Sequence, residues 1–273
     1  MKGVLTAFFF ISCWVLNAQK APDEPLSYQD DLDFEWQSEG TSHKLWAVSR
    51  SHAPIEVLLT DRSSQAEVRS VLLPSFEQIM VLEMTGPELE AVRAKIRDSL
   101  QIGYYFGHPD LIKADLNYPY LFPFRKGKKY EVSQGFNGKT SHHSEQSRYA
   151  IDFQLNVGEP VFAARPGLVV KVVDWFTKQG GPELRNAANR IVVLHDDGTI
   201  ASYVHLQFQG SLVAEGQQIA AGEKIGFSGL TGYTNGPHLH FVVRKERDQA
   251  IPVYFTGYEG KALKQGKRYK RNH

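Results

Sequence analysis

Short β-like segments separated by turn residues recur through the C-terminal half of the chain, and they restrict the possible folds more than any other feature. Apolar residues alternate or run continuously in these segments, which is typical of half-buried and fully buried strands. Asp196-Asp197-Gly198 predicts a tight hairpin between two of them. We therefore expect a mainly β protein with an antiparallel sheet in this half. The segments are Ala150–Leu155, Gly167–Val173, Arg190–His195, Ile200–Leu206, Glu223–Phe227 and Leu239–Arg244.

A small β-rich accessory domain is predicted for residues 44–117. Apolar and polar residues begin to alternate at Leu45, and strand-like patterning returns around Pro74. The first stretch has hairpin-like strand patterning, and Val71 to Leu82 predicts further strand. Leu89, Val92, Ile96 and Leu100 fit one face of a helix that Pro87 would open at its first position, although a strand would explain them equally well. A run rich in Tyr, Phe, Pro and Lys places the boundary near residue 117, so residues 118–247 form the second predicted domain.

The two ends of the chain have distinct compositions. Residues 1–18 carry one basic residue, Lys2, then an apolar run of about 14 residues, shorter than the roughly 20 that span a bilayer. We interpret them as a cleaved signal peptide, with membrane-anchor and lipoprotein readings as alternatives. Residues 19–43 are acidic and predict a linker or a first strand. Residues 248–273 form a basic tail, for which we expect a frayed end or contact with anionic envelope polymers.

Charge and cysteine content exclude several functions. The formal net charge of +1 lacks the basic excess that binding of a phosphate backbone requires, so we expect no nucleic-acid partner. Cys13 is the only cysteine and lies in the predicted signal peptide. A mature chain would have no disulfide and no thiolate nucleophile. Any metal must then be held by His, Asp, Glu, Asn or water.

Histidines gather in the segments of the C-terminal half. Successive side chains on a strand point to opposite faces, so His238 and His240 share one face, and so do Tyr203 and His205. A coincidental exposed pair would also explain the first motif. Asp152 lies in an apolar segment where an aspartate is disfavoured, which suggests a metal or a hydrogen-bond network. Two imidazoles, one carboxylate and an open position form a recurrent catalytic zinc arrangement.

The C-terminal half resembles the lysostaphin-type (LytM-like) zinc metallopeptidases over about residues 118–245. The resemblance implies the duplicated hybrid motif fold and cleavage of peptides in peptidoglycan. It also implies that His142, Asp152 and His240 bind Zn²⁺ and that His205 and His238 are uncoordinated catalytic histidines, with Tyr203 as a possible helper. The matching stretches are Gln134–Gly138, Ser141–His142, Tyr149–Phe153, Gly158–Ala164, Val192–Gly198, Tyr203–Leu206, Gly222–Gly226 and Gly229–Phe241.

The first ligand is the least secure, because many family members place it four residues before the aspartate, where this chain has Arg148. His142 and His143 are the candidates, and counting back from Asp152 favours His142. We expect His43, His52, His108 and His273 to be surface or packing residues. For His195, beside the predicted hairpin, we expect a structural cap, with support of a metal ligand as the alternative.

We expect an exported zinc endopeptidase, located in the periplasm, the cell envelope or outside the cell. It would be a monomer that acts on peptidoglycan peptides, with an accessory domain that orients substrate, gates the groove or binds an envelope protein. The alternative is a non-catalytic member of the same fold that binds the wall or activates another hydrolase.

Overall fold

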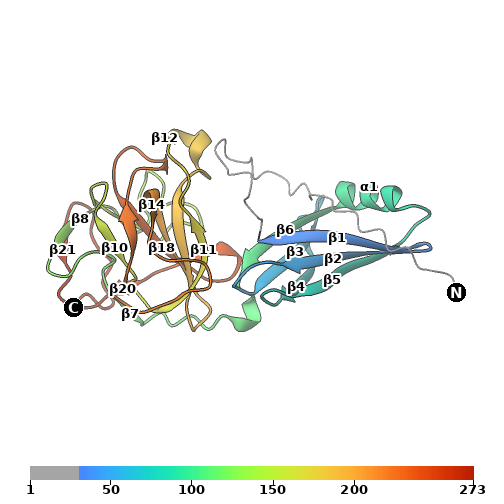
Figure 1. Ribbon diagram of the computed structural model, residues 1–273, viewed down its shortest axis with the longest axis horizontal. Helices are drawn as coiled ribbons and strands as arrows, with labels where there is room; N and C mark the ends of the chain where they lie inside the picture. The colour runs from blue at the N-terminus through green and yellow to red at the C-terminus, as the bar shows by residue number, and fades with distance from the viewer. Residues whose placement is uncertain (1–30) are drawn as a thin grey trace. The chain divides into compact units, whose positions relative to one another are not determined.

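The computed structural model describes residues 31–273, so the predicted signal peptide, Cys13 and the start of the acidic segment lie outside the described residues. The described chain divides into two compact units, residues 31–105 and 106–273 (Figure 1). Within residues 31–273 no helix combines the length and the apolarity that a bilayer crossing requires.

The N-terminal unit contains two three-stranded antiparallel sheets and one helix. The strand orders are β1-β2-β5 and β4-β3-β6. In β2, inward and outward residues alternate strictly, as expected for a sheet with one covered face. The elements are β1 (Leu32–Glu39), β2 (Ser42–Ser49), β3 (Ile55–Asp61), β4 (Glu67–Leu73), β5 (Gln78–Thr85), α1 (Leu89–Ser99) and β6 (Leu100–Phe106).

The first strand and the helix of this unit are both predicted from the sequence, and the structure corrects where the helix begins. In the acidic segment, β1 is the first strand, because Leu32 and Phe34 are buried and pair along β2. The helix is confirmed as α1, but Pro87 does not open it. Glu88 is the N-cap and Leu89 is the first helical residue, while Leu100 is already extended and begins β6.

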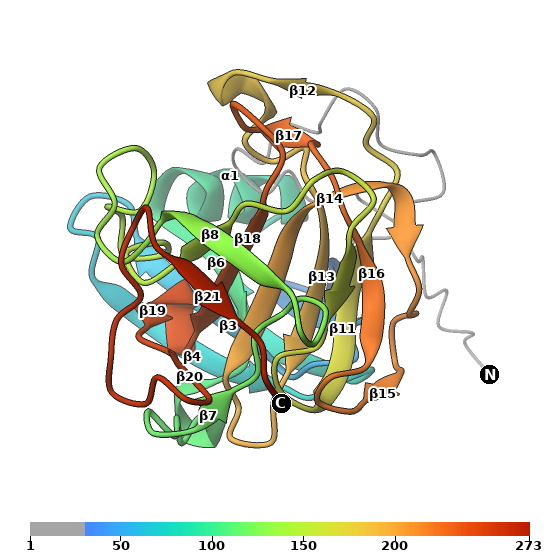
Figure 2. The same ribbon diagram turned by 90° about the vertical axis from the view of Figure 1, so that its left-hand side faces the viewer.

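The C-terminal unit is built on a large sheet with the strand order β15-β11-β13-β14-β18-β9-β8-β21 (Figure 2). β10 and β16 pair beside it, and β19 pairs with β18. All these pairs are antiparallel. The strands are β8 (Lys129–Gln134), β9 (Ile151–Phe153), β10 (Pro160–Phe162), β11 (Gly167–Val173), β13 (Asn189–Leu194), β14 (Ile200–Ser211), β15 (Gln218–Ile219), β16 (Lys224–Ser228), β18 (Leu239–Arg244), β19 (Ala250–Ile251) and β21 (Arg268–Lys270).

Short elements complete the unit. Two small parallel pairs lie apart from the large sheet, β12 with β17 and β20 with β7. The short strands are β7 (Pro119–Tyr120), β12 (Gln179–Gly180), β17 (Gly232–Tyr233) and β20 (Tyr254–Phe255). Three short 3-10 helices are η1 (Pro109–Leu111), η2 (Pro182–Leu184) and η3 (Glu246–Asp248).

The predicted strand segments are all present in this unit. β11 and β18 have the predicted bounds, and β14 runs past its predicted end to Ser211. The hairpin between β13 and β14 is confirmed, since His195 N donates to Thr199 O at 2.9 Å and Gly198 N donates to His195 O at 3.0 Å. The mainly β fold follows from this regular alternation.

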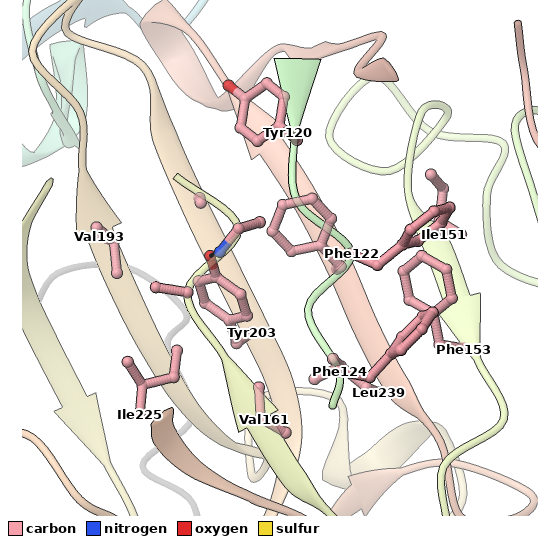
Figure 3. Packing of buried hydrophobic residues seen from close by; sticks show 14 of the residues in the cluster. Tyr120, Phe122, Phe124, Ile151, Phe153, Val161, Val193, Tyr203, Ile225 and Leu239 are labelled. Atoms are coloured by element: carbon pink, nitrogen blue, oxygen red, sulfur yellow. Dashed lines mark hydrogen bonds between the residues drawn. The ribbon is translucent and has the colours of Figure 1, made fainter. Parts of the chain in front are cut away.

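An aromatic core fixes the strands that carry the histidines. Phe122 stacks on Phe255 with ring centroids 4.5 Å apart, and Phe153 contacts both rings. Figure 3 shows Phe122, Phe124 and Phe153 close together in this cluster. Phe241 packs against Tyr203 on the neighbouring strand. Full burial of such a side chain contributes about 1.5–3 kcal/mol, so this cluster holds β9 and β18 rigidly in place.

The basic C-terminal segment is packed, and the expectation of a frayed end is wrong. β21 pairs with β8, and Leu263 is buried in the main core. Arg271 is also buried, and its Nη1 donates to Phe124 O at 2.9 Å. Apolar and aromatic residues between the basic ones explain this docking, since Tyr269 packs against the same core.

Candidate metal centre

The pairing of β9 with β18 places Asp152 directly opposite His240. On both strands the neighbouring residues enter the core, as the alternation predicts: Ile151 and Phe153 are fully buried on β9, and Leu239 on β18. Asp152 and His240 therefore share the other face of the sheet. His240 Nδ1 lies 2.9 Å from Asp152 Oδ1.

His142 reaches the same carboxylate from the loop that follows β8. The loop turns tightly, with His142 N donating to Gly138 O at 3.0 Å. The imidazole is fully buried, its Nδ1 lies 3.0 Å from Gly135 O, and its Nε2 lies 3.2 Å from Asp152 Oδ1. His143 is exposed. Of the two candidates, the structure brings His142 to the carboxylate.

The donor atoms of this cluster suit a metal ion. One ligand atom from each of His142, Asp152 and His240 lies within 4.8 Å of the other two. Gly135 O can only accept, so Nδ1 of His142 carries a proton and Nε2 is the ring atom directed at the carboxylate. Nε2 is buried and has no hydrogen-bond partner among the described residues, yet it faces a carboxylate oxygen. Two acceptors at this distance require a cation between them, either a proton or a metal.

Electrostatics at the cluster favour the ionised carboxylate. Burial raises the pKa of Asp152, but the contacts with the imidazoles of His142 and His240 outweigh it, and the pKa lies well below its ordinary value. Burial lowers the pKa of His142, whereas the bond to Asp152 and its charge raise it overall. Burial dominates at His240 and lowers its pKa. The ionised carboxylate of Asp152 thus lies between two imidazoles, and only that of His240 has a lowered pKa.

Gln134 at the end of β8 connects the two parts of the cluster. Its Nε2 donates to Asp152 Oδ2 at 3.1 Å and to Ser141 Oγ at 2.8 Å. Its Oε1 accepts from Thr140 N at 3.0 Å. A Cβ at Gly138 would lie 2.3 Å from Cγ of Gln134 and 2.7 Å from its Oε1, so the loop needs glycine there. Gln134 leaves Oδ1 of Asp152 facing the histidines and holds the loop that carries His142.

His205 joins the cluster through a β-bulge. Asn189 pairs with Leu206 and Arg190 with Val204, so His205 is an extra residue on β14, with φ of 65°. This conformation turns the imidazole toward the other histidines. Its centroid lies 4.6 Å from that of His238 and 6.0 Å from that of His240.

Backbone carbonyls fix the protonation of the two outer imidazoles. His205 Nδ1 lies 2.8 Å from Thr231 O, and His238 Nδ1 lies 2.9 Å from Gly236 O. Both Nδ1 atoms therefore donate, and both Nε2 atoms are available to the cluster. Burial and the nearby charges of His238 and His240 lower the pKa of His205 to about 3, so it is neutral at pH 7.

The prediction that Tyr203 shares a face with His205 is wrong, because the bulge breaks the alternation between them. Tyr203 is fully buried in the core, and its hydroxyl accepts from Ala164 N at 2.8 Å. It pairs with Phe241, the inward neighbour of His240. A helper role for Tyr203 in the site does not fit this position.

The remaining histidines have structural contacts or lie apart from the cluster. His195 is buried, and its Nδ1 donates to Pro166 O at 2.8 Å, which fits the expected structural cap. His43 contacts Ser38 Oγ and Gly86 O in the N-terminal unit.

Sequence reasoning missed two residues that hold the site together. Gln134 was recognised only as the first letter of a matching stretch. Thr231 donates its hydroxyl proton to Leu206 O at 2.8 Å and accepts from Asn189 N at 3.0 Å, which braces both sides of the bulge. Neither position has a periodic or compositional signal, since each acts through partners distant in sequence.

A sequence comparison agrees with this geometry. Residues 146–252 match the model of Peptidase family M23. The matched part of the C-terminal unit is similar to peptidase family M23. The matched range includes Asp152, His205, His238 and His240, while His142 precedes it, so its assignment depends on the contacts described above.

Individual relatives of the M23 domain cover the same region. The glycyl-glycine endopeptidase ALE-1 of Staphylococcus capitis is 36% identical over 45% of this chain and 30% of its own length. The peptidoglycan DD-endopeptidase ShyA of Vibrio cholerae is 31% identical over 41% of this chain and 24% of its own. The chain thus spans less than a third of either relative. The lysostaphin catalytic domain of Staphylococcus simulans aligns with 30% identity over 46% of this chain and 87% of that one, with a TM-score of 0.34.

Proposed function

We propose that this protein is a zinc-dependent endopeptidase that hydrolyses peptide bonds in bacterial peptidoglycan. The observation that carries the proposal is the convergence of His142, Asp152 and His240, with the buried Nε2 of His142 directed at a carboxylate oxygen and without a hydrogen-bond partner among the described residues. Two imidazoles and one carboxylate, with no cysteine, form a donor set typical of catalytic rather than structural zinc.

In this proposal His142, Asp152 and His240 hold the zinc ion. A bound zinc ion of this kind supplies a Lewis acid and lowers the pKa of a coordinated water to about 7. The side chains of His240 and His238 are 15% and 17% exposed, whereas His142 is closed off, so substrate reaches the cluster from the side of His238 and His240.

The two outer histidines would handle the protons of the reaction. Neutral His205 presents Nε2 as an acceptor and takes a proton from the attacking water. His238 Nε2 lies 3.7 Å from Asp152 Oδ1, and as an imidazolium this ring would donate a hydrogen bond to the oxyanion of the tetrahedral intermediate. The Nδ1 bonds to Thr231 O and Gly236 O keep both rings oriented for these roles.

The names of two relatives indicate the class of substrate. One is a glycyl-glycine endopeptidase and the other a peptidoglycan DD-endopeptidase, and their common substrate chemistry is a peptide bond of the cell wall. We extend this class to the present chain, together with export to the periplasm or cell envelope and action as a monomer. The N-terminal unit would orient the substrate or bind an envelope protein.

Zinc content and turbidity of purified cell-wall sacculi test the proposal together. We expect about one zinc per chain and a fall in turbidity with the wild-type protein, and neither with His240→Ala. A metal-free wild-type protein, or lysis that His240→Ala leaves unchanged, would contradict it. Sacculi that are bound without any loss of turbidity would instead indicate a non-catalytic wall-binding protein.

A further inference from the structure

A basic ribbon forms one edge of the large sheet and has no part in the proposed site. It consists of β8 with the turn before it and β21 with the turn before it. The two run side by side (Figure 2). Backbone bonds extend the pairing at both ends, from Gly127 N to Arg271 O at 2.8 Å and from Val132 N to Lys267 O at 2.9 Å. The exposed cations of this ribbon are Arg125, Lys126, Lys128, Lys129, Lys264, Lys267, Arg268 and Lys270.

The pairing register separates charge from apolar surface. Tyr130 is paired with Tyr269, and both pack against the main core. The flanking pairs point the other way and place Lys129 opposite Lys270, and Arg268 opposite Glu131. Glu131 is the only acid within the two segments 125–134 and 264–271. The outer face of the ribbon is therefore almost purely cationic.

This arrangement costs stability unless something compensates it. Like charges directly opposite each other on antiparallel strands are destabilising, and Lys129 and Lys270 are such a pair. None of the eight cations forms a side-chain ion pair with any residue in the part of the chain that the structure describes. The chain as a whole carries a net charge of only +1, so the positive charge is concentrated here.

We propose that the basic ribbon binds a solvated linear polyanion of the cell envelope, with phosphate or carboxylate groups spaced along an extended chain. Six of the eight cations are lysines, which act as flexible point charges rather than as rigid forks for a single ligand. No exposed large hydrophobic side chain lies in the ribbon, and a membrane-inserting surface would need one. A polymer therefore fits better than a lipid surface.

The ribbon also has a fixed relation to the metal centre. β8 begins at Lys129 among the cations and ends at Gln134, which donates to Asp152. Five residues of strand span roughly 17 Å. A polymer held on the ribbon would keep the cluster within reach of the surrounding wall, and binding itself does not require the peptidase activity proposed above.

Binding to long-chain polyphosphate and to poly-glutamate, measured by fluorescence anisotropy at about 50 mM salt, tests this proposal with the full chain. We compare the wild type with a quadruple variant, Lys126→Gln, Lys128→Gln, Lys267→Gln and Lys270→Gln. The matched control is Lys95→Gln, Arg97→Gln, Lys139→Gln and Lys224→Gln, which removes four exposed cations elsewhere. Exposed substitutions of this kind rarely affect folding, and circular dichroism checks that they do not.

We expect the ribbon variant to bind at least one polymer tenfold or more weakly, the control to bind like the wild type, and rising salt to weaken wild-type binding. Equal weakening in both variants would overturn the proposal, and so would no binding by the wild type. Sedimentation with vesicles of phosphatidylcholine and phosphatidylglycerol at 4:1 is the second arm. Binding to vesicles but to neither polymer would also overturn it, in favour of a membrane surface.

Discussion

His240 on β18 lies directly opposite Asp152 on β9, with His240 Nδ1 2.9 Å from Asp152 Oδ1. The distance is set by the register of two strands whose alternate residues are locked in an aromatic core. Side chains placed by packed strands keep their geometry better than side chains placed by loops. The cluster is therefore preformed on its β9–β18 side, and only His142 depends on a loop.

Replacing Gln134 with Leu should weaken zinc binding about 10–100-fold, the usual effect of losing a partner that orients a metal ligand. Leucine removes the hydrogen bonds to Asp152 Oδ2 and to the loop that carries His142. Competition with a chromogenic chelator measures the affinity. Gln154→Leu, an exposed glutamine just after β9, is the control. Equal affinity of the two variants would mean that Gln134 does not position the ligands.

Replacing His205 with Ala should lower the rate of peptide-bond cleavage about 10²–10⁴-fold, the range typical of a lost general acid or base. Zinc content should stay at the wild-type level, because His205 is not part of the ligand cluster. Cleavage is followed through new amino groups released from sacculi. If zinc content falls with activity, His205 supports the metal rather than the proton transfer.

How far the sequence predicts this site depends on how regular each strand is. The two-residue period predicts the shared face of Asp152 and His240, because the pairing of β9 with β18 has no irregularity, and it extends to His238 just before β18. It failed for Tyr203 and His205, since a bulge with φ of 65° lies between their faces and no periodicity signals it. Gln134 and Thr231 were missed for a related reason: their partners lie up to 42 residues away along the chain. The helix was predicted from its apolar face, whereas its first residue depended on backbone angles at Glu88.

Replacing Tyr203 with Phe should reduce stability and leave catalysis intact. The phenol hydroxyl accepts from Ala164 N in the core, and losing it leaves a buried N–H without a partner, which costs about 1–3 kcal/mol. Urea unfolding followed by circular dichroism measures the loss. A large fall in the rate on sacculi at unchanged zinc content would restore a catalytic role for Tyr203.

Acid should destabilise the C-terminal unit partly through His195. Burial lowers its pKa to about 4 from an ordinary value of 6.5. The unfolded chain therefore binds a proton below pH 6.5 that the folded chain does not bind until about pH 4. Stability is greatest above pH 6.5 and falls as the pH drops toward 4, by roughly 3 kcal/mol at most from this group.

The variant His195→Asn tests this linkage. An asparagine amide takes the place of Nδ1 and still donates to Pro166 O, but it does not titrate. The unfolding free energy of the variant, measured from pH 7.5 to 4, should fall less steeply than that of the wild type. Parallel pH profiles for the two proteins would show that His195 does not contribute to acid sensitivity.

The adjacent histidines of the loop after β8 give the most direct test of the zinc centre. Metal is removed from the wild type, His142→Ala and His143→Ala, and one equivalent of zinc is returned before amino groups released from sacculi are measured. We predict that the wild type and His143→Ala bind the zinc and cleave, whereas His142→Ala does neither, because, of these two adjacent histidines, His142 contacts Asp152 and His143 is exposed. Zinc binding and cleavage by His142→Ala at the wild-type level would contradict the account.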